Sequence, residues 1–178
     1  MVLRRCDRCQ FVKPYFAYFV GEALSIHLIP IMEPIVNLVF LVLVPFVVYR
    51  KKLEELGFKN FRRGFFFGLS AFIFLPFLRF PLSPFPFVDA FAQSLFFKGF
   101  FYSVFENEML FWKFSRLNLI SSFLYFLVFL GVSGSFLAVS YFVVSVITGI
   151  LYEESGSLLS SILFHTGFFI STLSVLFR

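Results

Sequence analysis

The segment GFFFGLSAFIFLPFLRF, residues 64–80, decides the fold class, because it is apolar throughout except for Arg79 near its end. The whole chain shares this character: 33 of its 178 residues are Phe, 60% are hydrophobic and 14% are charged. Soluble domains carry about 25% charged residues, and disordered chains are poor in aromatic residues. A helix crosses a bilayer with roughly 20 mostly apolar residues. The sequence therefore predicts an all-α integral membrane protein.

Basic residues predict how the helices are oriented. The tail 1–13 and the loop 50–63 both carry clusters of Lys and Arg, which are retained on the cytoplasmic side of a membrane. An even number of crossings must separate them, so we expect a helical hairpin over 14–49 and a membrane core over 50–178. The loop is long enough for a short interfacial helix. The other five predicted spans cover 64–80, about 88–112, 118–130, 135–151 and 157–177.

This arrangement predicts a polytopic bundle of about seven spans in the cell membrane, with a cytoplasmic N-terminus and lipid as its first partner. The net charge of +5 does not indicate nucleic-acid binding, because Lys and Arg occur in short clusters between apolar runs. Cys6 and Cys9 have metal-ligand spacing, but a structural zinc site normally needs four ligands and the chain has no second pair. We expect a reduced tail, no metal and no cofactor.

Ionisable side chains inside predicted spans are functional candidates, because they are costly in lipid. Glu108 lies five residues before Lys113, or about 7–8 Å from the cytoplasmic end of its span, and His165 lies about 12 Å from the same side. Similar depths predict that Glu108 and His165 approach each other. A carboxylate base and an imidazole that stabilises an oxyanion could together activate water. The full set of ionisable candidates is Glu22, His27, Lys98, Glu106, Glu108 and His165.

Glu106 and Glu108 are 200° apart on an ideal helix, so only one of them can face the centre of the bundle. Glu106 shares a face with Lys113, and both an ion pair with Lys113 and a catalytic role are open to it. Glu108 has no charged neighbour on its own face. Glu108, His165 and Glu106 are therefore the predicted catalytic residues.

Two stretches resemble the CPBP intramembrane proteases, the family of the type II CAAX prenyl endopeptidases. Residues 108–113, EMLFWK, resemble the family motif Glu-Glu-x-x-x-Arg, and residues 149–165, GILYEESGSLLSSILFH, are similar to the last motif, which ends in His-x-x-x-Asn. The likeness covers roughly 50–178. It implies a glutamate-dependent hydrolase in which Glu108 activates water and His165 holds the oxyanion, acting on a membrane-embedded or prenylated peptide.

The chain departs from the family at four motif positions. Met109 replaces the second Glu, Lys113 the Arg, Phe129 the His of a middle Phe-x-x-x-His motif, and Phe169 the final Asn. Lysine keeps the charge of arginine but loses its bidentate geometry. Three interpretations stay open: a divergent endopeptidase in which Glu106, Glu153 or Glu154 takes over a lost role, a non-catalytic scaffold or peptide-binding pseudoprotease, and a small transporter with Glu22, Lys98 and Glu108 as a charge path.

The first interpretation predicts that the reconstituted protein cleaves a membrane-embedded or prenylated peptide and that Glu108→Gln abolishes this activity, because the amide cannot act as a base. Mass spectrometry of the peptide measures the outcome. Cleavage that survives in the variant would contradict a catalytic role for Glu108.

Overall fold

The computed structural model describes residues 35, 37–77, 85–105, 108–111, 114–133 and 137–176. The predicted tail 1–13, with Cys6 and Cys9, and most of the first half of the hairpin, with Glu22 and His27, lie outside the described residues. Glu106 and Lys113 do so as well. The described elements are the π-helix η2 (Leu38–Val48), α3 (Phe61–Gly68), the 3-10 helix η3 (Leu69–Phe77), α4 (Phe85–Ser94), the π-helix η4 (Leu95–Phe100), α5 (Phe101–Val104), β1 (Met109–Phe111), β2 (Phe114–Ser115), α6 (Arg116–Ser133), α7 (Leu137–Ser155) and α8 (Leu158–Leu176).

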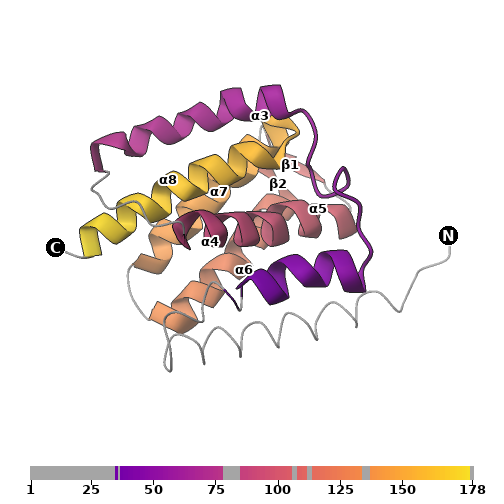
Figure 1. Ribbon diagram of the computed structural model, residues 1–178, viewed down its shortest axis with the longest axis horizontal. Helices are drawn as coiled ribbons and strands as arrows, with labels where there is room; N and C mark the ends of the chain where they lie inside the picture. The colour runs from indigo at the N-terminus through magenta and orange to yellow at the C-terminus, as the bar shows by residue number, and fades with distance from the viewer. Residues whose placement is uncertain are drawn as a thin grey trace.

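Helix α8 is the centre of the bundle (Figure 1), because it packs against α3, η3, α4 and α7. Helix α6 packs mainly against α7 and also contacts η4. The core between these helices is rich in aromatic side chains, as the composition requires, and Tyr125 is the largest side chain that is fully buried among the described residues. The buried core cluster consists of Leu41, Leu56, Ala92, Leu95, Phe96, Phe97, Phe100, Tyr125, Val128, Phe129, Ala138, Leu158 and Ile162.

Two glycines allow α3 to lie close to α8. Gly64 and Gly68 are one turn apart and buried, and a methyl group on them would meet the side chains of Ser157 and Leu163. Small residues spaced in this way let two helices approach closely and gain packing contacts along their length. The opposite face of α3, with Phe65 and Phe66, is consequently exposed.

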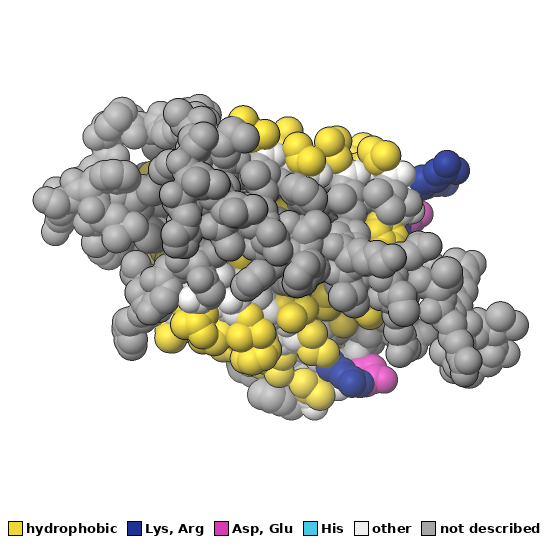
Figure 2. Space-filling view, turned by 90° about the horizontal axis from the view of Figure 1, so that it is seen from below, with side chains coloured by type: hydrophobic (Ala, Val, Ile, Leu, Met, Phe, Trp, Pro, Cys, Tyr) yellow, Lys and Arg dark blue, Asp and Glu magenta, His cyan; other side chains and the backbone are white. Residues whose placement is uncertain are grey.

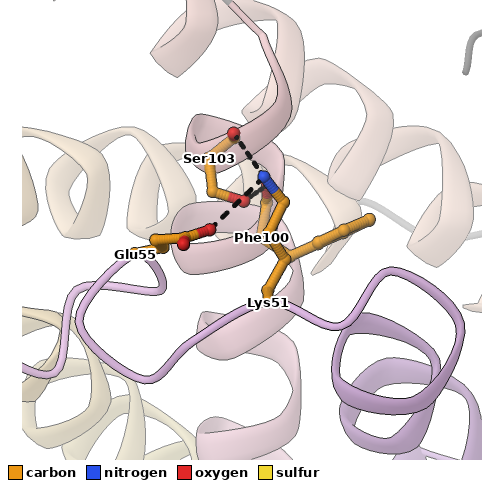
Figure 3. A network of polar contacts seen from close by, with 4 residues as sticks. All are labelled: Lys51, Glu55, Phe100 and Ser103. Carbon is orange, nitrogen blue, oxygen red and sulfur yellow. Dashed lines mark hydrogen bonds and ion pairs between the residues drawn. The ribbon is translucent and has the colours of Figure 1, made fainter.

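The loop before α3 is tied to the same end of the bundle by hydrogen bonds. The Leu158 amide donates to the Gly57 carbonyl at 2.8 Å. Figure 3 shows the Lys51 ammonium donating to the Ser103 carbonyl at 3.0 Å and pairing with Glu55 at 3.6 Å. These contacts bring the basic loop, the end of α5 and the start of α8 together.

Most of the predicted helices are confirmed. Helices α6, α7 and α8 correspond to the predicted runs 118–130, 135–151 and 157–177, and α3 with η3 corresponds to 64–80. The all-α class is confirmed in its main feature, since the only sheet among the described residues is the hairpin β1–β2. Within the described ranges, no helix combines the length and apolarity that a membrane span requires.

The predicted helix 88–112 is confirmed as far as Val104 and is wrong beyond it. The helical segment ends at Val104, Phe105 is extended, and the strands β1 and β2 pair in antiparallel orientation. The Arg116 amide donates to the Glu108 carbonyl at 2.8 Å across the base of this pair. The sequence Glu106-Asn107-Glu108 interrupts the apolar run with polar residues, and Asn favours turns. Polar residues before Met109 therefore end the helix, although the next three residues are apolar.

Charged side chains gather at one end of the molecule. Figure 2 shows strips of hydrophobic side chains along two flanks, with Lys, Arg, Asp and Glu side chains toward one end. The basic loop, the β1–β2 hairpin and the turn between α7 and α8 all lie at this end (Figure 1).

Replacing Gly64 and Gly68 together by Ala should lower the stability of the protein by about 1–3 kcal/mol, because the added methyl groups push α3 from α8. The loss is expected although Ala favours a helix more than Gly does. Thermal unfolding in detergent measures it, with the exposed Ser70→Ala as the control. An unchanged or higher unfolding temperature in the double variant would contradict the close α3–α8 contact.

Candidate functional site

His165 lies in the interior of the bundle, on the face of α8 that meets α4 and α6. Its side chain is 3% exposed. The Nδ1 atom is 3.3 Å from the Ser94 hydroxyl and the Nε2 atom is 2.8 Å from the Tyr125 hydroxyl. The Tyr125 hydroxyl also donates to the Gln93 carboxamide oxygen. Four side chains from three helices therefore form one buried chain of hydrogen bonds.

These bonds determine which nitrogen of His165 carries the proton. The Tyr125 hydroxyl has one proton, which it gives to Gln93, so its oxygen accepts from Nε2–H. Nδ1 is then the acceptor for the Ser94 hydroxyl. His165 is neutral in this arrangement. The Gln93 amide nitrogen is buried without a hydrogen-bond partner, which costs about 1–3 kcal/mol.

Lys98 forms a second buried polar group, one turn along from Ser94. Its side chain is 2% exposed. The ammonium donates to Asn118 Oδ1 at 3.2 Å and to the hydroxyls of Ser121 and Ser122 at 3.0 and 3.1 Å. Three acceptors match the three protons of an ammonium group. All three acceptors come from α6, so Lys98 joins η4 to that helix.

Asn118 connects this group to α7. Its amide donates to the Val146 carbonyl at 3.0 Å, while its oxygen accepts from Lys98. Gly149 makes the contact possible, because a methyl group there would overlap the Asn118 carboxamide. The small residue on α7 thus allows η4, α6 and α7 to share one polar side chain.

Glu153 is the acidic side chain nearest to this network among the described residues. One oxygen accepts from Tyr102 at 2.8 Å and from Ser115, whose hydroxyl also accepts from the backbone N–H of Asn118. The other oxygen is buried without a partner. Ser115 therefore links the Glu153 carboxylate to the start of α6, the helix that supplies the acceptors for Lys98.

The space between the two polar groups is narrow. It is lined by Gln93, Ser94, Phe97, Lys98, Tyr125, Ser145, Thr148 and His165. The gap between these side chains is too small to admit a water molecule. None of the lining residues is an Asp or Glu, so the side chains that surround His165 in the described structure supply no carboxylate.

Glu108 lies elsewhere, at the charged end of the molecule. It directly precedes β1, its side chain is 69% exposed, and it pairs with Arg116 at 3.3 Å. The structure therefore does not place Glu108 among the residues that bond to His165 or line its cavity. Glu106 lies outside the described residues, and its catalytic role, like that of Glu108, stays a prediction.

A comparison with protein families shows to which family the chain belongs. Residues 70–170, more than half of the chain, match the model of the Rce1-like type II CAAX prenyl endopeptidases. The chain belongs to the Rce1-like family. The predicted resemblance to the type II CAAX prenyl endopeptidases is thereby confirmed. No curated protein and no solved structure matches the chain.

The buried site of this Rce1-like protein repeats the spacing of the first family motif. Gln93, Ser94 and Lys98 stand at intervals of one and four residues, as do Glu, Glu and Arg in Glu-Glu-x-x-x-Arg. The same spacing occurs at Glu108, Met109 and Lys113. Among the described residues of the two sets, those that connect to His165 belong to the first: Ser94 bonds to it directly, and Gln93 is linked to it by way of Tyr125.

Aromatic residues surround the imidazole at the two remaining motif positions. Phe169, where the last motif has Asn, stacks on His165 with ring centroids 4.7 Å apart. Phe129, where the middle motif has His, lies 4.8 Å from the Tyr125 ring and stacks on Tyr141 at 4.1 Å. Both positions are therefore part of an aromatic cluster, and neither supplies a polar group.

Sequence reasoning missed Gln93, Ser94 and Tyr125 because it searched for ionisable residues. The signal that could have found them was the spacing of Gln93 and Ser94 before Lys98, a lysine within an otherwise apolar run. A buried lysine needs acceptors from neighbouring helices. The polar residues Asn118, Ser121 and Ser122, spaced three and four apart on one face of the predicted span 118–130, could have been recognised as those acceptors.

Replacing Asn118 by Ala should lower stability by about 1.5–3 kcal/mol, because it removes an acceptor from a buried ammonium. Thermal unfolding measures the loss. Thr166→Ala is a suitable control, since the Thr166 hydroxyl bonds only to Ile162 of its own helix among the recorded contacts. Equal, small effects of both substitutions would contradict the role of Asn118 in holding Lys98.

Proposed function

We propose that this member of the Rce1-like family is a non-catalytic membrane protein in which the polar centre of the bundle has become a structural element. One observation carries the proposal: no carboxylate of the described residues lines the space around His165, and this space is too small to admit a water molecule. A glutamate-dependent hydrolase needs both, because the carboxylate removes a proton from the water that attacks the peptide.

The register of the first motif supports this interpretation. We infer that Gln93, Ser94 and Lys98 occupy the positions of Glu, Glu and Arg. Glutamine and serine lack the basic oxygen of a carboxylate, so neither activates water in the way that the family motif implies. The loss of His at Phe129 and of Asn at Phe169 removes two more polar groups from the same centre. Four motif positions have thus changed toward neutral or apolar side chains.

Ser94 and His165 form a hydrogen-bonded pair of a hydroxyl and an imidazole. A serine hydroxyl that donates to a neutral imidazole is the first part of a nucleophile and base arrangement. Attack by Ser94 would require a substrate carbonyl about 3 Å from its oxygen, and the surrounding side chains leave no such space. The pair is better explained as two satisfied buried groups.

The membrane setting is part of the proposal. Large hydrophobic side chains are exposed on five of the described helices, η2, α3, η3, α6 and α7, for example Val47, Phe66, Ile73, Phe123 and Val143. Contiguous exposed apolar surface of this kind is rare on soluble monomers. Charged side chains gather at one end (Figure 2), as expected where a bundle meets the cytoplasmic surface. As a scaffold, the protein would present this apolar surface to lipid and to other membrane proteins.

Purified protein in liposomes should not cleave a farnesylated CAAX peptide or its unprenylated form. His165→Ala and Glu108→Gln should behave like the unchanged protein, because neither residue has a catalytic role in this account. Mass spectrometry of the peptides over several hours is the measurement. An active type II CAAX prenyl endopeptidase in identical liposomes serves as the positive control.

Cleavage above the empty-liposome background would contradict the proposal if His165→Ala or Glu108→Gln removed it. Loss only in Glu108→Gln would point to the site predicted from the hairpin, and loss in His165→Ala and Ser94→Ala would point to the buried pair. The two outcomes therefore separate the alternative active sites.

A further inference from the structure

The outer face of α3 presents both basic and apolar side chains, and these are exposed rather than packed against other described parts of the chain. Phe61 and Phe65 are 55% exposed and Phe66 is 71% exposed, and Arg62 and Arg63 are exposed beside them. A shallow hollow of about 700 Å³ lies on this face. It is lined by Asn60, Phe61, Arg62, Arg63, Phe65, Phe66 and Leu69.

Within the described part of the chain, no Asp or Glu pairs with the guanidinium groups of this hollow. Neither Arg62 nor Arg63 takes part in an ion pair recorded among the described residues. Arg63 lies over the Phe67 ring, with its guanidinium carbon 5.7 Å from the ring centroid. The first turn of α3 contains no Asp or Glu. Two neighbouring cations are therefore presented outward next to three exposed aromatic rings.

The occupant of such a surface must carry negative charge and apolar chains on one molecule. Guanidinium groups bind phosphate oxygens strongly and often with two parallel hydrogen bonds. Amphipathic helices with Arg on one side and Phe on the other lie in the headgroup region of a bilayer, with their apolar side chains in the acyl boundary. Anionic phospholipids meet both requirements.

The position of α3 in the fold agrees with a helix that lies at the headgroup level of the bilayer. The helix begins at the charged end, directly after the basic loop, and continues through η3 along the apolar flank of the bundle. Its inner face is held against α8 by Gly64 and Gly68, so the outer face keeps a constant orientation. The arginines would therefore lie at the headgroup level and the rings of Phe65 and Phe66 next to the acyl chains.

We propose that the hollow on α3 binds the phosphate headgroup of an anionic phospholipid through Arg62 and Arg63, with Phe61, Phe65 and Phe66 against its acyl chains. The inference rests on the membrane setting proposed above and is independent of whether the protein cleaves peptides. It assigns α3 the function of a lipid-selective anchor at the basic end of the bundle.

Binding of fluorescently labelled phosphatidylglycerol to the full-length protein in neutral detergent micelles tests the site, with labelled phosphatidylcholine as the zwitterionic comparison. The protein should prefer phosphatidylglycerol. Arg62→Gln with Arg63→Gln should weaken its binding roughly 30-fold, since each basic residue near a membrane surface contributes about fivefold. Binding of phosphatidylcholine should be unchanged.

The matched control is Arg50→Gln with Lys52→Gln, which removes the same charge from the same end without altering the hollow. This variant should retain the lipid preference, and an equal loss in both double variants would overturn the site in favour of general charge attraction. Equal affinity of the unchanged protein for both lipids, or competition by free glycerol phosphate as effective as that by phosphatidylglycerol, would also overturn it.

Extraction of cell membranes with alkaline carbonate separates this proposal from the membrane setting. The Arg62→Gln, Arg63→Gln protein should stay in the membrane pellet while losing lipid preference. Release of the unchanged protein by carbonate would contradict the membrane setting itself, whereas retention of all variants without any lipid preference would contradict only the site on α3.

Discussion

The need to satisfy one buried ammonium group constrains the centre of this protein. Lys98 is almost completely buried, and an unpaired ammonium in such a place would cost many kcal/mol. Asn118, Ser121 and Ser122 supply three acceptors from one face of α6. Asn118 reaches α7 as well, and only a residue without a side chain at Gly149 leaves room for it. The packing of η4, α6 and α7 follows from this single group.

If the protein is non-catalytic, as proposed above, the same centre would hold an Rce1-like bundle together without the family's chemistry. The hydrogen bonds that join Ser94, His165, Tyr125 and Gln93 tie α4, α6 and α8 together. Phe169 and Phe129 extend this polar chain with aromatic contacts. A reaction centre requires a cavity and a basic group, whereas a structural centre requires full packing and satisfied polar atoms. Apart from the Gln93 amide nitrogen, the residues around His165 meet the second description.

The sequence predicted the parts of this structure that depend on local pattern. Helices α6, α7 and α8 were found because long apolar runs are separated by glycine and polar residues, as at Glu153 to Gly156. The hairpin was missed because Met109 to Phe111 are apolar and suit a helix as well as a strand, and pairing with Phe114 and Ser115 depends on tertiary structure. His165 was identified as a site residue, but its partners were not, since Gln93 and Ser94 carry no charge. Glu108 is predicted to be catalytic because its spacing to Lys113 matches the family motif. In the structure it lies at the exposed base of the hairpin.

Double-mutant cycles on stability test the central claim most directly, namely that the polar centre consists of His165 with the residues of α4 and α6 and excludes Glu108. Tyr125→Phe and His165→Leu should show a coupling free energy of about 0.5–3 kcal/mol, as expected for residues in one hydrogen-bond network. Glu108→Gln and His165→Leu should be additive within about 0.5 kcal/mol. Additivity for Tyr125 and His165 together with strong coupling between Glu108 and His165 would contradict the account.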